Sequence, residues 1–340
     1  MLAKLLAYRD FARMTWVIRK ELKCEIEDVD AALAPTLVFP GILFGYDAFV
    51  RTGCHKIFWK FLKAVLYYGD RIIENFIHRY GTDVLKGLLD SQKTKDDFFL
   101  FPQDMTDRIG VGREHERLAA YYDQIRFDCE HFEALDPSGR ERMLQCFVAS
   151  SYAAIESTIF EDGWRKLDRE DPDIAKKLLE SVARTEYAKN VRVVMECLRI
   201  KELFGGFPVY PVDDHTMVCR TSHWFTLIDD LLDFKEDVTL NVPNHLVAFS
   251  HAEGEWKDME RCLNTSSLAV IPPDVLKKTA PRTMERFWFE YKSAKRSFVE
   301  AFPLCPRLLA GLIEWRALGA RHLSPFLTPA GQTLNAQNAV

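Results

Sequence analysis

No apolar run in this sequence is long enough to span a lipid bilayer. The longest one, residues 33–46, is interrupted by Pro35, Pro40 and Gly41, whereas a membrane-spanning helix needs about 20 mostly apolar residues in a row. Residues 1–23 carry charges throughout, which is typical of an amphipathic helix and not of a signal peptide. We therefore expect a soluble, cytoplasmic protein without a stable membrane anchor.

Paired cysteines and an excess of charge are also missing. The eight cysteines are scattered, without a Cys-x-x-Cys pair or a metal-ligand grouping with histidine. Such thiols are typical of an intracellular protein whose cysteines are reduced and mostly buried. The net charge of −5, with a pI near 6.0, gives no electrostatic reason to expect nucleic acid or an anionic membrane as a partner.

Sheet-like alternation is absent as well, and helical periodicity extends over nearly the whole chain. No low-complexity linker divides it, so we predict one domain over residues 1–330 and a flexible tail over 331–340. The fold class expected is all-α, a single-domain helical bundle around a central cavity. The predicted helices cover residues 2–23, 36–51, 55–80, 82–91, 105–134, 138–167, 173–204, 214–238, 244–264, 273–298 and 305–321.

Five acidic residues stand within positions 229–237, directly after an apolar, aromatic run. Asp229, Asp233 and Asp237 are spaced four residues apart, so on a helix their carboxylates lie along one face. Like charges at this spacing repel each other unless a cation lies beside them. Magnesium binds a few carboxylates and leaves positions for phosphate oxygens. We predict Asp229, Asp230, Asp233 and Asp237 as Mg²⁺ ligands, with an ordinary solvated acidic face as the alternative.

The segment FTLIDDLLDFKED, residues 225–237, resembles the second aspartate-rich motif of the class I isoprenoid synthase superfamily. That superfamily includes prenyl diphosphate synthases, squalene and phytoene synthases, and terpene cyclases. In all of them helices surround a cavity, and two acidic motifs hold magnesium against a diphosphate. The resemblance covers residues 30–322. It implies a prenyl diphosphate substrate and three Mg²⁺ ions, with Mn²⁺ as the substitute and a homodimer left open.

Two details of this segment point to one branch of the superfamily. Thr226 replaces the glutamine that chain-elongating synthases usually carry, and their Gly-Lys does not follow. The spacing of the three aspartates matches the metal triad of terpene cyclases, although squalene-type enzymes also carry spaced aspartates here. The resemblance therefore implies a terpene synthase, a carbon–oxygen lyase acting on farnesyl or geranylgeranyl diphosphate. The alternatives are a prenyl transferase or squalene/phytoene-type condensing enzyme, and a non-catalytic helical scaffold or subunit.

The first acidic motif of the superfamily has no regular counterpart, because no DDxxD lies upstream. Asp70 and Glu74 follow a strongly apolar helical run and are one turn apart, so they could share a metal ion. Asp96 and Asp97, in a DDFF sequence after a lysine-rich stretch, are the other candidate. We prefer Asp70 and Glu74. An ordinary surface pair beside Arg71 is the alternative for them.

Basic residues at the offsets found in terpene cyclases are candidates to bind the diphosphate. Arg184 precedes Asp229 by about 45 residues and Arg316 follows the triad by about 85 residues, which are the family's offsets. The planar guanidinium bonds two phosphate oxygens at once and stays charged. Asp229, Asp233, Arg184 and Arg316 are the predicted catalytic residues, and Lys235 is a further phosphate contact. Lys189 and Arg192 are weaker candidates.

An allylic cation must be kept from water, and aromatic faces stabilise it by about 1–2 kcal/mol per well-placed ring. The chain contains 24 Phe, 11 Tyr and 7 Trp, enough to line such a cavity. Ordinary core packing is the alternative for each ring, and His223 is expected to be a packed or capping residue. The candidate lining residues are Tyr67, Tyr152, Trp224, Phe225 and Trp315.

Overall fold

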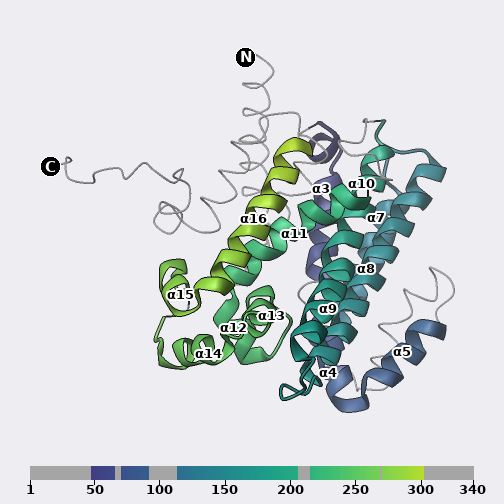
Figure 1. Cartoon of the computed structure of the whole chain (residues 1–340). Helices are drawn as coiled ribbons and strands as arrows, with labels where there is room; N and C mark the ends of the chain where they lie inside the picture. Colours follow the sequence, from purple (N-terminus) through teal and green to yellow (C-terminus); the bar gives the residue numbers. More distant parts are fainter. Residues whose placement is uncertain (1–46, 66–69, 92–112, 206–214, 269, 302–340) are drawn as a thin grey trace. The chain divides into compact units, whose positions relative to one another are not determined.

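The computed structural model of this chain is helical (Figure 1). It describes residues 47–65, 70–91, 113–205, 215–268 and 270–301. Within these ranges there is no strand, which confirms the all-α class. None of the described helices combines the length and the apolar character that crossing a membrane requires. The central cavity remains a prediction.

Contacts between helices group the chain into two compact units, whose boundaries fall just after α8, inside α9 and inside α11. Unit 1 takes its residues from Met1–Lys166 and Ala183–Ser222, and unit 2 from Leu167–Val182 and His223–Val340. The prediction of a single domain is not tested by this grouping. The elements are η1 (Asp47–Arg51), α3 (Cys54–Leu62), α4 (Asp70–Tyr80), α5 (Thr82–Ser91), α7 (Arg113–Glu130), α8 (Pro137–Arg165), α9 (Ile174–Glu186), η3 (Tyr187–Val191), α10 (Arg192–Glu202), α11 (His215–Leu232), α12 (Phe234–Leu240), α13 (His245–Ala252), α14 (Trp256–Thr265), α15 (Pro273–Thr279) and α16 (Pro281–Ala301).

Helix α8 is the centre of unit 1, because α4, α5, α7, η3 and α10 all pack against it. Its start follows from the sequence: Asp136 accepts a hydrogen bond from the Gly139 amide at 2.6 Å, and Pro137 occupies the first helical position. Phe147 of α8 packs against Phe58 and Phe61 of α3, with ring centres 5.1 and 4.9 Å away. These contacts make one aromatic core from segments far apart in the chain.

The cysteines of unit 1 belong to the same core. Cys54, Cys129, Cys146 and Cys197 are buried and lie on α3, α7, α8 and α10. The six cysteines in the described part of the chain are free thiols. For these residues the prediction of mostly buried cysteines is confirmed, and that of a reduced state stays a prediction.

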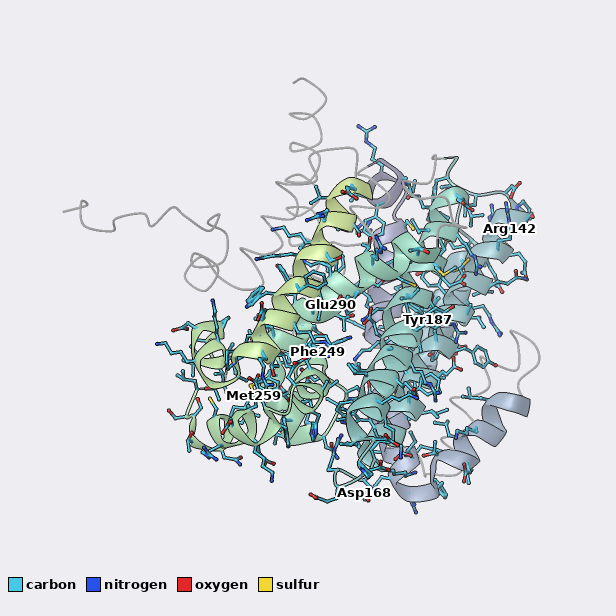
Figure 2. The ribbon with its side chains drawn as sticks, viewed as in Figure 1. Arg142, Asp168, Tyr187, Phe249, Met259 and Glu290 are labelled. Atoms are coloured by element: carbon cyan, nitrogen blue, oxygen red, sulfur yellow. The ribbon has the colours of Figure 1, made fainter. Side chains whose placement is uncertain are left out.

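In unit 2, α13 packs against α14 and α16, and α15 packs against the same two helices. Phe249 of α13 and Met259 of α14, both labelled in Figure 2, are buried. Asn244 caps α13 by accepting a hydrogen bond from the Leu246 amide at 2.8 Å. The acidic segment, residues 229–237, belongs to the same unit and spans the end of α11 and the first part of α12.

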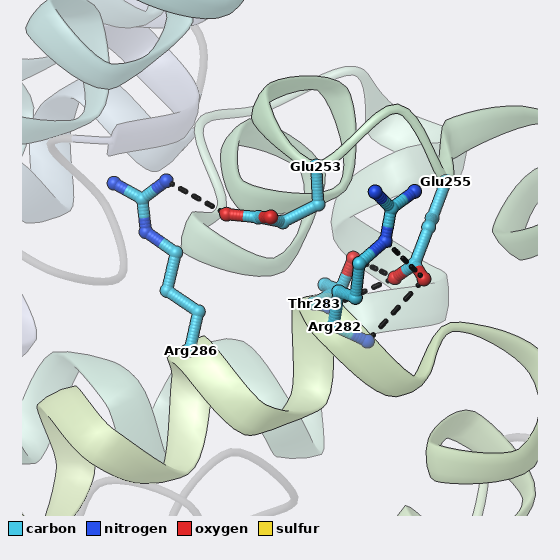
Figure 3. A network of polar contacts seen from close by, with 5 residues as sticks. All are labelled: Glu253, Glu255, Arg282, Thr283 and Arg286. Atoms are coloured by element: carbon cyan, nitrogen blue, oxygen red, sulfur yellow. Dashed lines mark hydrogen bonds and ion pairs between the residues drawn. The ribbon is translucent and has the colours of Figure 1, made fainter.

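A buried carboxylate joins α14 to α16 in unit 2 (Figure 3). Glu255 accepts hydrogen bonds from the amide and hydroxyl of Thr283, both at 2.8 Å, and from the amide and guanidinium of Arg282. Burial alone would raise the pKa of Glu255, but these hydrogen bonds outweigh it and lower the pKa. Nearby, Arg286 pairs with Glu253 at 3.2 Å. The first amides of α16 are therefore capped by the side chain of the residue that precedes α14.

Two long helices expected in unit 2 are each divided. The prediction over 244–264 is wrong at Gly254, whose φ of +69° ends α13 and starts the turn into α14. The prediction over 273–298 is wrong at Ala280, which is not helical (φ −136°, ψ 73°), because proline disfavours a helical conformation in the residue before it. In contrast, 173–204 is helical almost to its predicted end, with the π-helical turn η3 between α9 and α10.

Candidate functional site

The acidic segment lies at the junction of α11 and α12. The predicted continuous helix over 214–238 is wrong at Asp233, where φ is −98° and ψ is 7°. The helical hydrogen-bond spacing nevertheless continues across the break. The Asp233 amide donates to the Asp229 carbonyl at 2.9 Å, and the Asp237 amide donates to the Asp233 carbonyl at 2.8 Å. The three aspartates therefore stay one turn apart although the helix is interrupted.

Buried apolar residues on both sides hold this junction in place. Trp224, Leu227, Ile228 and Leu231 of α11 and Phe234 of α12 are all buried, whereas Asp229 and Asp233 are exposed. The alternation follows helical periodicity, with the apolar face toward the core and two carboxylates toward solvent. Two of the four predicted ligands in this segment, Asp229 and Asp233, are therefore exposed to solvent.

Asp237 differs from these two because it is partly buried. Its Oδ2 accepts a hydrogen bond of 2.8 Å from Asn244 Nδ2. Burial raises the pKa of Asp237 to about 8, and the negative charges of Asp230, Asp233 and Asp229 add to the increase. The bond from Asn244 acts in the opposite direction. The four aspartates thus form one electrostatic group, in which a cation would relieve repulsion.

Asp230 has a different environment from the other three. It is only 5% exposed, and its Oδ2 accepts two hydrogen bonds of 2.7 Å from His245, one from the amide and one from ring Nδ1. Asn244 Nδ2 also donates to the Asp230 carbonyl at 2.8 Å. Asp230 therefore caps the start of α13 and orients the ring of His245. We retain Asp229, Asp233 and Asp237 as the metal ligands of our proposal.

Lys235 makes contacts that its predicted role did not include. Its Nζ donates to the Ser266 carbonyl at 2.7 Å and to the Leu268 carbonyl at 3.0 Å. Ser266 is the C-terminal cap of α14, where unsatisfied carbonyls and the helix dipole favour a cation. These bonds give Lys235 a structural role, and its predicted contact with phosphate is untested.

The remaining predicted site residues are described only in part. Arg184 is exposed in the last turn of α9, in unit 1. Asp70 begins α4 and Glu74 follows one turn later, but their side chains lie outside the described part of the chain. Asp96, Asp97 and Arg316 lie outside the described residues altogether.

The two weaker phosphate candidates have acidic partners on α8. Arg192 pairs with Glu156, and Lys189 lies 3.9 Å from Glu161. These pairs give both basic residues a role within unit 1.

Among the aromatic residues predicted to line a cavity, Trp224 has the most contacts in the described part of the chain. It is fully buried, and its ring centre lies 4.6 Å from that of Phe298, 5.1 Å from that of Phe225 and 6.4 Å from that of Tyr291. The contacts with Phe298 and Tyr291 pack α11 against α16. Tyr152 lies on α8 in unit 1, and Tyr67 and Trp315 lie outside the described residues.

Two residues of the site were not found by sequence reasoning, Asn244 and His245. An asparagine before an apolar helical run is a typical N-cap signal, so the start of α13 was detectable. Its bond to Asp237 and that of His245 to Asp230 depend on how two helices pack, and no spacing rule indicates them.

No family model, curated protein or solved structure matches this chain.

Proposed function

We propose that this chain is a magnesium-dependent class I terpene synthase that ionises a prenyl diphosphate and cyclises the resulting cation. The observation that carries the proposal is the group of carboxylates at the α11–α12 junction. Asp229 and Asp233 are exposed and Asp237 is partly buried, and the backbone bonds keep them one turn apart. The all-α class is the one that the proposal requires.

The donors are of the type that fits magnesium, because they are carboxylate oxygens, the ligands that this hard cation prefers. Their negative charges act on one another, so a divalent ion would compensate them, and the three side chains would have to turn toward the ion to bring their oxygens together. Asp229, Asp233 and Asp237 would hold the ion. When bound, magnesium supplies Lewis-acid assistance to departure of the diphosphate.

The chain's own residues around the junction position these ligands. Asn244 fixes the Asp237 carboxylate with one amide hydrogen, and its other contacts bind the start of α13 to Asp230. Lys235 joins α12 to the end of α14. The Asp237 carboxylate, held by the hydrogen bond from Asn244, would lose little freedom when a cation binds, which favours binding. Arg184 and Arg316 are proposed to contact the diphosphate.

Product analysis tests the proposal. Purified protein is incubated with Mg²⁺ and farnesyl or geranylgeranyl diphosphate, with and without isopentenyl diphosphate. A cyclase gives a hydrocarbon or terpene alcohol from the first mixture. A longer diphosphate from the second mixture would instead indicate a prenyl transferase, and a head-to-head condensation product a squalene/phytoene-type enzyme. Absence of turnover together with absence of Mg²⁺-dependent diphosphate binding would favour the non-catalytic scaffold.

One variant and a matched control locate the activity. Asp229→Asn removes a charge from an exposed ligand and should lower turnover by at least about 100-fold while the far-UV circular dichroism stays unchanged. Asp258→Asn makes the same change on α14, where Asp258 pairs with Arg261 at the surface, and should leave turnover intact. Full activity of Asp229→Asn would show that the site is elsewhere.

A further inference from the structure

Two imidazoles lie edge to face within unit 2, beside the acidic group. His223 lies in α11 and His245 is the first residue of α13. Their ring centres are 4.8 Å apart and their planes meet at 70°. A ring nitrogen of one lies within 4.8 Å of a ring nitrogen of the other. The two side chains therefore present nitrogen donors to the same small volume.

This separation matches that of two histidines that share one metal ion. A zinc–nitrogen bond of about 2.0–2.1 Å and a tetrahedral angle place the two ring centres about 5 Å apart. The observed ring-centre distance of 4.8 Å is close to that value. The two donor nitrogens, which lie within 4.8 Å of each other, would approach to about 3.3 Å around the ion. An edge-to-face ring contact without a metal is the competing explanation.

The surroundings of His245 favour a ligand role. Asp230 Oδ2 lies 2.7 Å from Nδ1 of the His245 ring and 2.7 Å from the His245 amide. A carboxylate that accepts from one ring nitrogen fixes the tautomer and the ring orientation and makes the other nitrogen, Nε2, a better donor to a metal. Asp230 and His245 are both at most 5% exposed, so the surrounding side chains restrict the orientation of the His245 ring.

We propose that His223 and His245 form a binding site for a borderline transition-metal ion of the Zn²⁺ class, with Asp230 as its orienting residue. Nitrogen donors suit Zn²⁺, Ni²⁺ and Cu²⁺, whereas the carboxylates of Asp229, Asp233 and Asp237 suit magnesium. The proposed ion would join α11 to α13. This second metal site is proposed independently of the synthase activity.

Metal binding by the full-length protein tests the site. After chelator treatment and dialysis, the chain is titrated with Zn²⁺ against a chromogenic chelator, and with Co²⁺ by visible spectroscopy. We expect one Zn²⁺ to bind and Co²⁺ to give ligand-field bands. The affinity for both ions should fall by at least about 100-fold in His223→Gln. In Asp230→Asn it should fall by about 10–100-fold. His251→Gln, a change to another histidine of α13, should keep both.

Several outcomes would overturn the proposal. Zn²⁺ binding that is equal in wild type and His223→Gln would mean that the two rings only pack, and a thiolate charge-transfer band with Co²⁺ would assign the ion to cysteine. If His223→Gln does not fold, the imidazole NMR signals of the wild type decide, because Zn²⁺ must shift two of the nine histidines. Asp237→Asn separates the two proposals: it should remove Mg²⁺-dependent turnover and retain the Zn²⁺ site.

Discussion

At the scale of single residues, Asp237 is the group of the acidic segment whose ionisation the folded protein disfavours. A carboxylate that is partly removed from water and surrounded by three others costs free energy when it is ionised, which is why its pKa rises to about 8. One amide hydrogen bond from Asn244 offsets only part of that cost. Proteins retain such arrangements where function requires them, and stability is lowered in exchange.

Asp237→Asn should therefore stabilise the protein in the absence of metal while it removes the activity that we propose. Asparagine keeps the shape and an oxygen that accepts from Asn244, but it removes the repelling charge. At pH 9, where the wild-type carboxylate is ionised, we expect a gain of about 1–2 kcal/mol in the free energy of unfolding, measured with urea in chelator. Mg²⁺-dependent turnover should be lost. A variant that is less stable than the wild type at pH 9 would contradict the assigned repulsion.

At the scale of helices, the junction between α14 and α16 depends on one ionised carboxylate. Glu255 has a folded-state pKa below its value in the unfolded chain, because Thr283 and Arg282 donate to it. Its contribution to stability is therefore present above the unfolded pKa, near 4.3, and is lost as the pH falls through the lower folded pKa. The cap of α16 is expected to weaken in acid.

Glu255→Gln tests that dependence. The neutral amide cannot accept the same set of bonds at full strength, so we expect a loss of about 2 kcal/mol at pH 7 that shrinks below about pH 4. Glu253→Gln, which removes only the partner of Arg286, should cost less than about 1 kcal/mol. Urea titrations from pH 3 to pH 7 measure both. A pH-independent loss in Glu255→Gln would mean that the charge is not the relevant feature.

The helices also show what the sequence could predict. Apolar periodicity located α5 and α8 to within a residue or two, and the glycine and proline at the turns of Gly254 and Pro281 are sequence signals of a helix end. The break at Asp233 has neither glycine nor proline and results from packing. The spacing of the acidic residues was visible in the sequence, and their metal-ligand role stays a prediction. The bond between His245 and Asp230 joins residues on two helices, so no spacing rule indicates it.

At the scale of the whole chain, the reactivity of four buried thiols is a measure of how well the core of unit 1 is packed. They come from four helices, and burial raises the pKa of each one, in the case of Cys197 to about 12. Because only the thiolate reacts with alkylating agents, these cysteines are protected both by packing and by protonation. Cys219 and Cys262 are half-buried.

Brief alkylation followed by mass spectrometry should separate the two classes. At pH 8 in native buffer we expect Cys219 and Cys262 to be modified well before Cys54, Cys129, Cys146 and Cys197. In urea the four should become reactive over one common transition, because they share a core that opens cooperatively. Native labelling of any of the four at the rate of Cys262 would show that this core is not packed as described.

The bonds from Lys235 to the carbonyls of Ser266 and Leu268 have a consequence for engineering. Lys235 lies between two of the proposed ligands, Asp233 and Asp237, so a connection some thirty residues later in the chain acts as a buttress for them. Surface loops usually tolerate insertions, but a change in the length of residues 266–272 would displace the buttress. That connection offers a way to adjust the acidic segment without altering any aspartate.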